Sequence, residues 1–175
     1  MKYDLIFLDR DGTLNPDPGY ISSLDDFEFY PFTIDALKQL DGQSFIIITN
    51  QSGVARGIID EGNLEEIHQY IRKMFSENHI NLKAIYLCTD HPDRPTERRK
   101  PGPGMFREAA RDFNLDLSRC LVIGDAESDI LAGQNLSMDT MLVLTGKGKE
   151  TLPGLTVKPT FVAENLLEGV KLLER

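Results

Sequence analysis

Tryptophan is absent from this sequence, cysteine is scarce, and no apolar run is long. Two cysteines, Cys88 and Cys120, in 175 residues cannot form the disulfide framework of a small secreted protein, which favours a reducing compartment. The first apolar run, Leu5–Leu8, ends in a charged segment and is far too short for a signal-peptide core or a membrane span. We therefore expect a cytoplasmic protein that makes no membrane contact.

Positive charge is also in short supply. The chain carries 19 Lys and Arg against 28 Asp and Glu, which gives a net charge of −9 and a pI near 4.8. Because nucleic acids attract basic surfaces, this balance disfavours a nucleic-acid partner. The length and the 41% hydrophobic content are those of one soluble globular domain, which we place at residues 1–175 as a monomer or weak oligomer.

Short apolar runs alternate with helical stripes along the chain. Each run is continuously apolar, as expected for a parallel strand covered on both faces: Leu5–Leu8, Phe45–Ile48, Ile85–Leu87, Leu121–Ile123 and Met141–Leu144. Helical periodicity lies near residues 34–40, 64–75, 103–113, 130–131 and 166–173, and Asn63 and Glu66 are spaced as a capping box. This alternation predicts an α/β fold, a doubly wound, Rossmann-like parallel sheet with five main strands.

In such folds the active site lies beyond the carboxyl ends of the strands. Asp9 and Asp11 follow the first run, and Gly12 and Thr13 come directly after them. The first carboxylate can attack phosphorus, while the second can protonate the leaving oxygen and later deprotonate water. An Asp-x-Asp pair alone is as often an ordinary polar loop, but the Gly-Thr that follows favours the catalytic interpretation.

Three further segments also follow a strand or open a helix. Thr49 begins Thr-Asn-Gln-Ser-Gly, whose hydroxyl and backbone N–H groups suit phosphoryl oxygens, although the same residues make ordinary turns. Lys100 lies in a proline-rich loop just ahead of a helix, whereas most arginines around it are expected to be solvated. Asp125 and Asp129 follow the fourth run, where the alternative is that Asp125 or Ser128 only caps a helix.

The predicted site is strongly acidic. Asp9, Asp11, Asp125 and Asp129 bring up to four negative charges together, with only Lys100 opposing them. Carboxylates this close repel one another and raise their own pKa values. A hard divalent cation relieves the repulsion, and Mg²⁺ suits a site that also receives phosphate.

These four segments, in this order, resemble the four motifs of the haloacid dehalogenase superfamily of phosphatases. The resemblance spans almost the whole chain and implies Asp9 as the nucleophile and Asp11 as the general acid/base. It implies that Thr49 and Lys100 stabilise the transferred phosphoryl group. The implied Mg²⁺ site consists of Asp9, the backbone carbonyl of Asp11, and Asp125, with Asp129 supporting Lys100 or a metal-bound water.

The residues around three of these motifs resemble one family within the superfamily, the D-glycero-D-manno-heptose 1,7-bisphosphate 7-phosphatases. The segments that carry this resemblance are Asp-Arg-Asp-Gly-Thr-Leu-Asn from Asp9, Thr-Asn-Gln-Ser-Gly-Val-Ala-Arg-Gly from Thr49, and Arg-Lys-Pro-x-Pro-Gly-Met from Arg99. The resemblance implies removal of the 7-phosphate during synthesis of nucleotide-activated heptose for lipopolysaccharide or other surface glycans. It implies that Arg99 recognises the sugar phosphate and that the substrate site is lined by Asp17, Gly19, Tyr20, Asn50, Gln51 and Ser52.

One departure from that family concerns zinc. Its members often carry a Cys-x-His…Cys-x-Cys zinc loop before the Arg-Lys-Pro segment, but here Cys88 is followed by Asp90, Thr96 and Arg98 at the other ligand positions. His91 is the one substitute nearby, and two ligands cannot close a tetrahedral site. We therefore predict Mg²⁺ without zinc, and Cys88 as a buried residue at a strand end.

The spacing of the motifs leaves no room for a large cap domain, so loops at 15–25 and 89–99 are expected to shape an open pocket. Two other activities share closely related motifs: histidinol-phosphate phosphatase, and polynucleotide 3′-phosphatase, which the acidic charge disfavours. A non-catalytic phosphosugar-binding module on the same fold is a further alternative. The intact residues Asp9, Asp11, Thr49, Lys100 and Asp125 argue against it.

Overall fold

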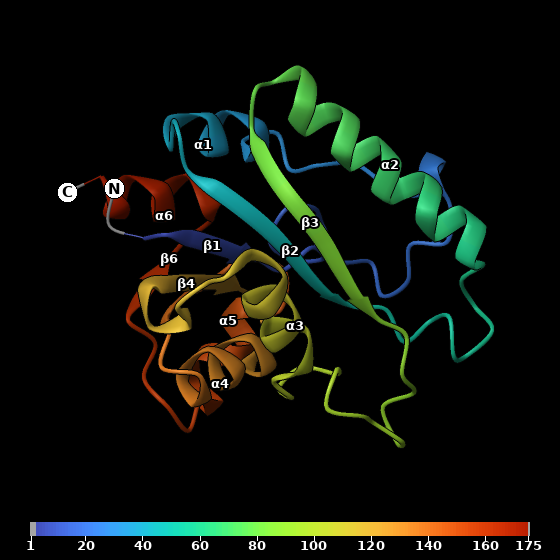
Figure 1. The fold of residues 1–175 in the computed structure, drawn as a ribbon. Coiled ribbons are helices and arrows are strands. Elements are labelled where there is room, and N and C mark those ends of the chain that lie inside the picture. Colours follow the sequence, from blue (N-terminus) through green and yellow to red (C-terminus); the bar gives the residue numbers. More distant parts are fainter. Residues whose placement is uncertain (1–2, 175) are drawn as a thin grey trace.

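A parallel sheet of six strands crosses the part of the chain that the computed structural model describes, residues 3–174 (Figure 1). Its order is β3-β2-β1-β4-β5-β6. The strands are β1 (Leu5–Leu8), β2 (Ser44–Asn50), β3 (Asn81–Cys88), β4 (Cys120–Gly124), β5 (Asp139–Val143) and β6 (Phe161–Ala163). The predicted α/β fold with a doubly wound parallel sheet is confirmed, and the predicted number of five main strands is corrected by the short sixth.

Strand β1 lies between β2 and β4, and all four of its residues are buried. Leu8 is in register with Ile47 of β2 and with Ile123 of β4. The backbone N–H of Asp9 then donates to the carbonyl of Ile123 at 2.9 Å. The residue that follows β1 therefore lies in the middle of the carboxyl edge, between the ends of two neighbouring strands.

Helices cover both faces of the sheet, as a parallel sheet requires. Helices α1 (Thr33–Gln39), α2 (Glu61–Glu77) and α6 (Leu166–Leu173) share one apolar core with the side chains of Ile6 and Leu8. Helix α3 (Gly104–Phe113) and α4 (Glu127–Asn135) share the other core with Leu5 and Phe7. Figure 1 shows these two groups of helices on opposite sides of the sheet. Together they hold the strands, and so the carboxyl edge, in place.

The remaining elements are short: α5 (Gly148–Thr151) and the 3₁₀ turns η1 (Leu24–Asp26), η2 (Leu117–Arg119) and η3 (Leu152–Gly154). Helix α2 begins earlier than predicted. Its N-cap is Asp60, whose side chain accepts the backbone N–H of Asn63 at 3.1 Å, so the capping box predicted at Asn63 and Glu66 is wrong. Asp60 is a strong cap by itself, which moves the helix start back by three residues.

Within residues 3–174, the segments 9–32 and 89–103 run as loops and short turns, and neither forms a large cap. The absence of room for a cap domain is thereby confirmed. None of the helices described is long and apolar enough to cross a membrane. Both loops reach the carboxyl edge of the sheet, where they border the site described next.

Candidate active site

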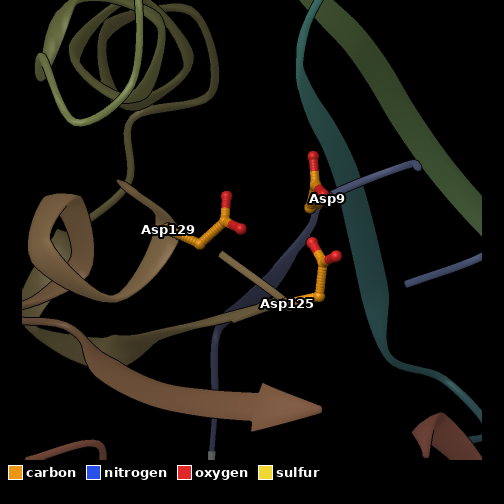
Figure 2. A group of neighbouring side chains, drawn as sticks. All are labelled: Asp9, Asp125 and Asp129. Carbon is orange, nitrogen blue, oxygen red and sulfur yellow. The ribbon is translucent and has the colours of Figure 1, made fainter. Parts of the chain in front are cut away.

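Three carboxylates meet at the carboxyl edge of the sheet. Asp9 follows β1, Asp125 follows β4, and Asp129 lies in the first turn of α4. One oxygen of each lies within 4.8 Å of the others, and all three side chains are buried. Figure 2 shows their carboxylates turned toward a common space. The helix-capping alternative for Asp125 and Ser128 is wrong, because the N-cap of α4 is Ala126, whose backbone N–H donates to Asp129 at 3.2 Å.

The ammonium of Lys100 lies between two of these carboxylates. Its Nζ is 2.8 Å from Asp9 Oδ1, 2.6 Å from Asp129 Oδ1 and 2.8 Å from the carbonyl of Ile48. Three acceptors therefore use all three donors of the ammonium. Asn50 at the end of β2 fixes the backbone of Lys100, because its amide accepts the lysine N–H at 3.1 Å and donates to the lysine carbonyl at 3.2 Å.

Burial and mutual repulsion shape the charges here. Burial raises the pKa of Asp9, and Asp129 and Asp125 raise it further, while Lys100 opposes them. Burial and the neighbouring Asp129 raise the pKa of Asp125 to about 6. Burial lowers the pKa of Lys100, but Asp129 and Asp9 outweigh it and raise that pKa above its usual value. Lys100 thus stays charged and leaves a surplus of negative charge.

The donor set fits a divalent cation. Lys100 and the N–H of Ala126 use both oxygens of Asp129, so this carboxylate is committed to the protein. Asp9 uses Oδ1 for Lys100 and Asp125 uses Oδ2 for the N–H of Lys147, and neither Lys100 nor Lys147 binds the other oxygen of these carboxylates. Carboxylate oxygens are the ligands that Mg²⁺ prefers, and a cation between them neutralises the repulsion that raises their pKa values.

The orientation of Asp125 is set by backbone packed closely around it. Its Oδ2 accepts the N–H of Lys147 at 2.8 Å. Gly12 and Gly146 both have positive φ, +89° and +53°, and a Cβ on either would lie 2.0 or 2.2 Å from the same oxygen. Thr145 ties the two loops together, since its hydroxyl donates to the carbonyl of Gly12 at 2.7 Å. Only glycine fits at either position.

We expect Gly146→Ala to weaken Mg²⁺ binding about tenfold, because a displaced supporting contact around a metal ligand has an effect of that order. Gly57→Ala is the matched control, since Gly57 also has a positive φ, +71°, but open space around its Cβ position. Both variants carry the backbone strain of about 1–2 kcal/mol, and calorimetric titration with Mg²⁺ separates the clash from the strain. Equal Mg²⁺ affinity in the two variants would show that Asp125 does not need this cradle.

Asp11 stands apart from the acidic cluster. Its carboxylate accepts from Arg10 through Nε at 2.8 Å and Nη2 at 3.0 Å, from Asn15 at 2.9 Å and from Gln51 at 3.0 Å. Although burial raises the pKa of Asp11, these donors, Arg10 first among them, hold it below its usual value. The expectation of four carboxylates opposed by Lys100 alone is therefore wrong, because Arg10 neutralises the fourth.

A cavity of about 270 Å³ opens over these residues. It brings together eleven of the predicted site residues: Asp9, Asp11, Asp17, Gly19, Tyr20, Thr49, Asn50, Gln51, Ser52, Arg99 and Asp125. Lys100 and Asp129 lie behind its wall, 4% and 1% exposed. Lys147 also lines the cavity, with its Nζ 3.8 Å from Asp17, and the sequence reasoning missed it. The glycines on both sides of Lys147 were the one signal in the sequence that could have pointed to this turn.

The side-chain amides of Asn50 and Gln51 form hydrogen bonds with other residues of the site, which the sequence did not predict. Asn50 holds the backbone of Lys100, as described above, and the Gln51 amide donates to Asp11 and, at 2.8 Å, to the Thr49 hydroxyl. Both side chains were predicted to bind substrate, and both reach the cavity. The Gln51 amide donates to Asp11 and Thr49, and the Asn50 amide donates to the carbonyl of Lys100, so both side chains also position neighbouring site residues.

The loop before Arg99 is closed by hydrogen bonds. Asp90 Oδ2 accepts from the N–H and the hydroxyl of Thr96 at 2.7 and 2.6 Å. Arg98 donates to the carbonyl of Leu87 at 2.8 Å and forms an ion pair with Glu108 of α3. Cys88 is 2% exposed at the end of β3, so its prediction as a buried strand-end residue is confirmed. These contacts hold the loop that places Arg99 and Lys100 at the site.

Comparison with known proteins begins with sequence. A family model described as HAD-hydrolase-like matches residues 97–169. The D-glycero-β-D-manno-heptose-1,7-bisphosphate 7-phosphatase of Photorhabdus laumondii is 38% identical over 156 residues, which cover 83% of this chain and 83% of the relative. The protein of the same name from Escherichia coli K12 is 37% identical and covers 81% of this chain and 80% of its own.

Solved structures agree. The D,D-heptose 1,7-bisphosphate phosphatase from B. bronchiseptica, complexed with magnesium and phosphate, superposes with a TM-score of 0.91 at 33% identity over 98% of each chain. The protein of that name from Burkholderia thailandensis has a TM-score of 0.74 at 26% identity, covering 98% of this chain and 99% of its own. Both similarities extend over nearly the whole chain and so include the sheet and the four segments at its carboxyl edge.

Proposed function

The chain belongs to the haloacid dehalogenase-like phosphatases, in the same family as the heptose 1,7-bisphosphate 7-phosphatases, and we propose that it removes the 7-phosphate of D-glycero-D-manno-heptose 1,7-bisphosphate through an aspartyl-phosphate on Asp9. The observation that carries the proposal is the buried cluster of Asp9, Lys100, Asp125 and Asp129 at the sheet edge. Phosphoryl transfer requires such an arrangement, in which a nucleophile lies beside a positive charge and a site for a metal ion.

In the first step Asp9 attacks phosphorus and the sugar oxygen leaves. Lys100 holds Asp9 in place at 2.8 Å, and the Thr49 hydroxyl, 1% exposed at the end of β2, is available to a phosphoryl oxygen. Asp9 and Asp125, with the backbone carbonyl of Asp11, would hold Mg²⁺. When bound, Mg²⁺ supplies charge neutralisation for the phosphoryl oxygens.

Asp11 acts as the general acid in the first step and as the general base in the second. In the first step its carboxyl gives a proton to the departing sugar oxygen, so it must exchange one of its four donors for that oxygen. In the second step the carboxylate takes a proton from the water that attacks the aspartyl-phosphate and releases Asp9. The donors around Asp11 favour the ionised form, which is the form that the second step uses.

The remote end of the substrate is recognised by two cations on the cavity wall. Nη1 of Arg99 is buried without a hydrogen-bond partner among residues 3–174, and the ammonium of Lys147 is held loosely, 3.8 Å from Asp17. An unpartnered guanidinium N–H in a cavity is a ready donor to a phosphate oxygen. We assign the phosphate that is not transferred to Arg99 and Lys147, and the sugar hydroxyls to Asp17, Tyr20 and Ser52.

Lys147→Met is expected to lower kcat/KM for the bisphosphate about tenfold, because a charged hydrogen bond to the remote phosphate is lost. A monophosphate with no second charged group should be hydrolysed by the variant within about twofold of the wild type. Lys149→Met, an exposed lysine of the same turn outside the cavity, is the control and should change neither substrate. An equal loss on both substrates would remove Lys147 from the recognition of the second phosphate.

The activity itself is tested by initial rates of phosphate release with saturating Mg²⁺, comparing heptose 1,7-bisphosphate with histidinol phosphate. The proposal expects kcat/KM to favour the bisphosphate at least about tenfold, and activity to disappear on chelation of the metal and return with Mg²⁺. A preference for histidinol phosphate would change the substrate and leave the chemistry standing. No phosphate release from any monoester would instead favour a binding module.

A further inference from the structure

Arg10 is a fully buried cation beside the nucleophile, and it contacts His68 as well as Asp11. Two of its nitrogens bind the two oxygens of Asp11, and Nη1 lies 3.1 Å from His68 Nε2. Its guanidinium also lies 5.8 Å from the ring centroid of Phe27. Arg10 is 0% exposed, so no solvent water replaces any of these partners.

The contact with His68 has one possible direction. A guanidinium only donates hydrogen bonds, so Nε2 of His68 must accept and the ring proton must sit on Nδ1. His68 Nδ1 has no hydrogen-bond partner among the described residues. Burial, and then the neighbouring Arg10, lower the pKa of His68 to about 3, which agrees with a neutral ring.

Packing alone does not account for a histidine at this place. The other buried side chains of α2 are all apolar: Leu64, Ile67, Ile71 and Phe75. An apolar side chain at position 68 would continue that face and would leave no ring N–H buried without a partner. Among residues 3–174, the one side-chain hydrogen bond of His68 is with Arg10, 58 residues away in the sequence. Its benefit must therefore come through Arg10.

We infer that His68 is a positioning residue for Asp11, acting through Arg10. The inference rests on the proposed function, in which Asp11 is the general acid/base. A bidentate guanidinium–carboxylate pair is planar, so an acceptor that fixes the third nitrogen of Arg10 also fixes the plane in which Asp11 lies. His68 does this from α2. Among the described residues, α2 donates no hydrogen bond to Asp11 directly, so its effect on Asp11 passes through Arg10.

The consequence is selective for substrates that need a proton. An alkyl phosphate leaves as a poor alkoxide and depends on Asp11, whereas p-nitrophenyl phosphate leaves as a stable phenolate and needs little acid. His68→Leu removes the acceptor and His68→Gln keeps one. We expect His68→Leu to lower kcat/KM for the sugar phosphate about tenfold or more, since small misplacements of catalytic groups cost factors of this size. Its kcat/KM for p-nitrophenyl phosphate should stay within about twofold, and His68→Gln should restore most of the lost activity.

Arg10→Lys is the second variant, because it keeps the charge but not the bidentate pair, and it should show the same selective loss if His68→Leu does not fold. Asp11→Asn is measured beside them. A selective loss in Asp11→Asn with none in His68→Leu or Arg10→Lys overturns this inference and leaves the proposed function intact. An equal loss on both substrates in His68→Leu and Arg10→Lys also overturns it, since that marks a purely structural role. If Asp11→Asn itself is not selective, the proposed role of Asp11 fails and the inference fails with it.

Discussion

Replacing Asp9 with asparagine is expected to reduce the turnover of phosphate monoesters by about 10⁴-fold or more, because loss of a nucleophile has effects of this size. The amide has almost the shape of the carboxylate, but it cannot form the acyl phosphate. The fold should persist, because Asp9 is one of three acidic groups whose repulsion the amide relieves, and Lys100 keeps Asp129 as its partner.

The comparison for this variant is Asp35→Asn, which makes the same chemical change at an exposed position in the first turn of α1. Asp35→Asn should retain wild-type rates. Phosphate release by both purified proteins, with circular dichroism to verify their folding, checks the expectation. A folded Asp9→Asn protein with rates near those of the wild type would mean that another group is the nucleophile.

Lys100→Met should lose both stability and activity. Removing one partner from a buried ion pair typically costs about 3–5 kcal/mol of unfolding free energy, because the charges left behind have no partner. Here two carboxylates, Asp9 and Asp129, lose the ammonium at 2.8 and 2.6 Å. Turnover should fall about 10²- to 10³-fold, as when one donor to a developing charge is removed.

Urea denaturation gives the stability of this variant, and Lys38→Met, an exposed lysine of α1, is the control that should leave it within about 0.5 kcal/mol. Mg²⁺ should recover part of the stability lost in Lys100→Met, since a cation between Asp9 and Asp125 replaces part of the missing charge. Unfolding midpoints that are equal in wild type and Lys100→Met would contradict the structural part of this expectation.

The pH range of the Lys100 contribution follows from the sign of its shift. Burial alone lowers the pKa of Lys100, but the two carboxylates raise it above the unfolded value. A group with a raised pKa stabilises the fold fully below its unfolded pKa, about 10.4 for lysine, and loses this effect as the pH rises through the folded value. As the pH rises from neutral, the difference in stability between wild type and Lys100→Met should therefore persist until strongly alkaline solution.

The central strands were predictable because they are buried on both faces and read as unbroken apolar runs. β1 and β4 are clear cases, and so is the core of β2. β6 was missed because it has three residues at the sheet edge, with Val162 40% exposed, and so shows neither a long run nor alternation. β3 was predicted too short for a similar reason, since its first residues at the edge are polar or half-exposed.

The acidic site was predictable because the order of the strands brings their ends together. Asp9, Thr49 and Asp125 each follow or end a strand that the apolar pattern identifies. His68 was missed because it lies within a helix and looks like an ordinary residue of its buried face. Lys147 was missed because one of its contacts, to Asp125, uses the backbone N–H, which carries no information in the sequence.

The stereochemistry at phosphorus tests the aspartyl-phosphate most directly. A substrate whose transferred phosphorus is made chiral with oxygen isotopes is hydrolysed, and the configuration of the released phosphate is determined by ³¹P NMR. Two in-line displacements, one by Asp9 and one by water, predict net retention of configuration. Net inversion would mean that water attacks the substrate directly, and Asp9 would then be no more than a ligand or a base.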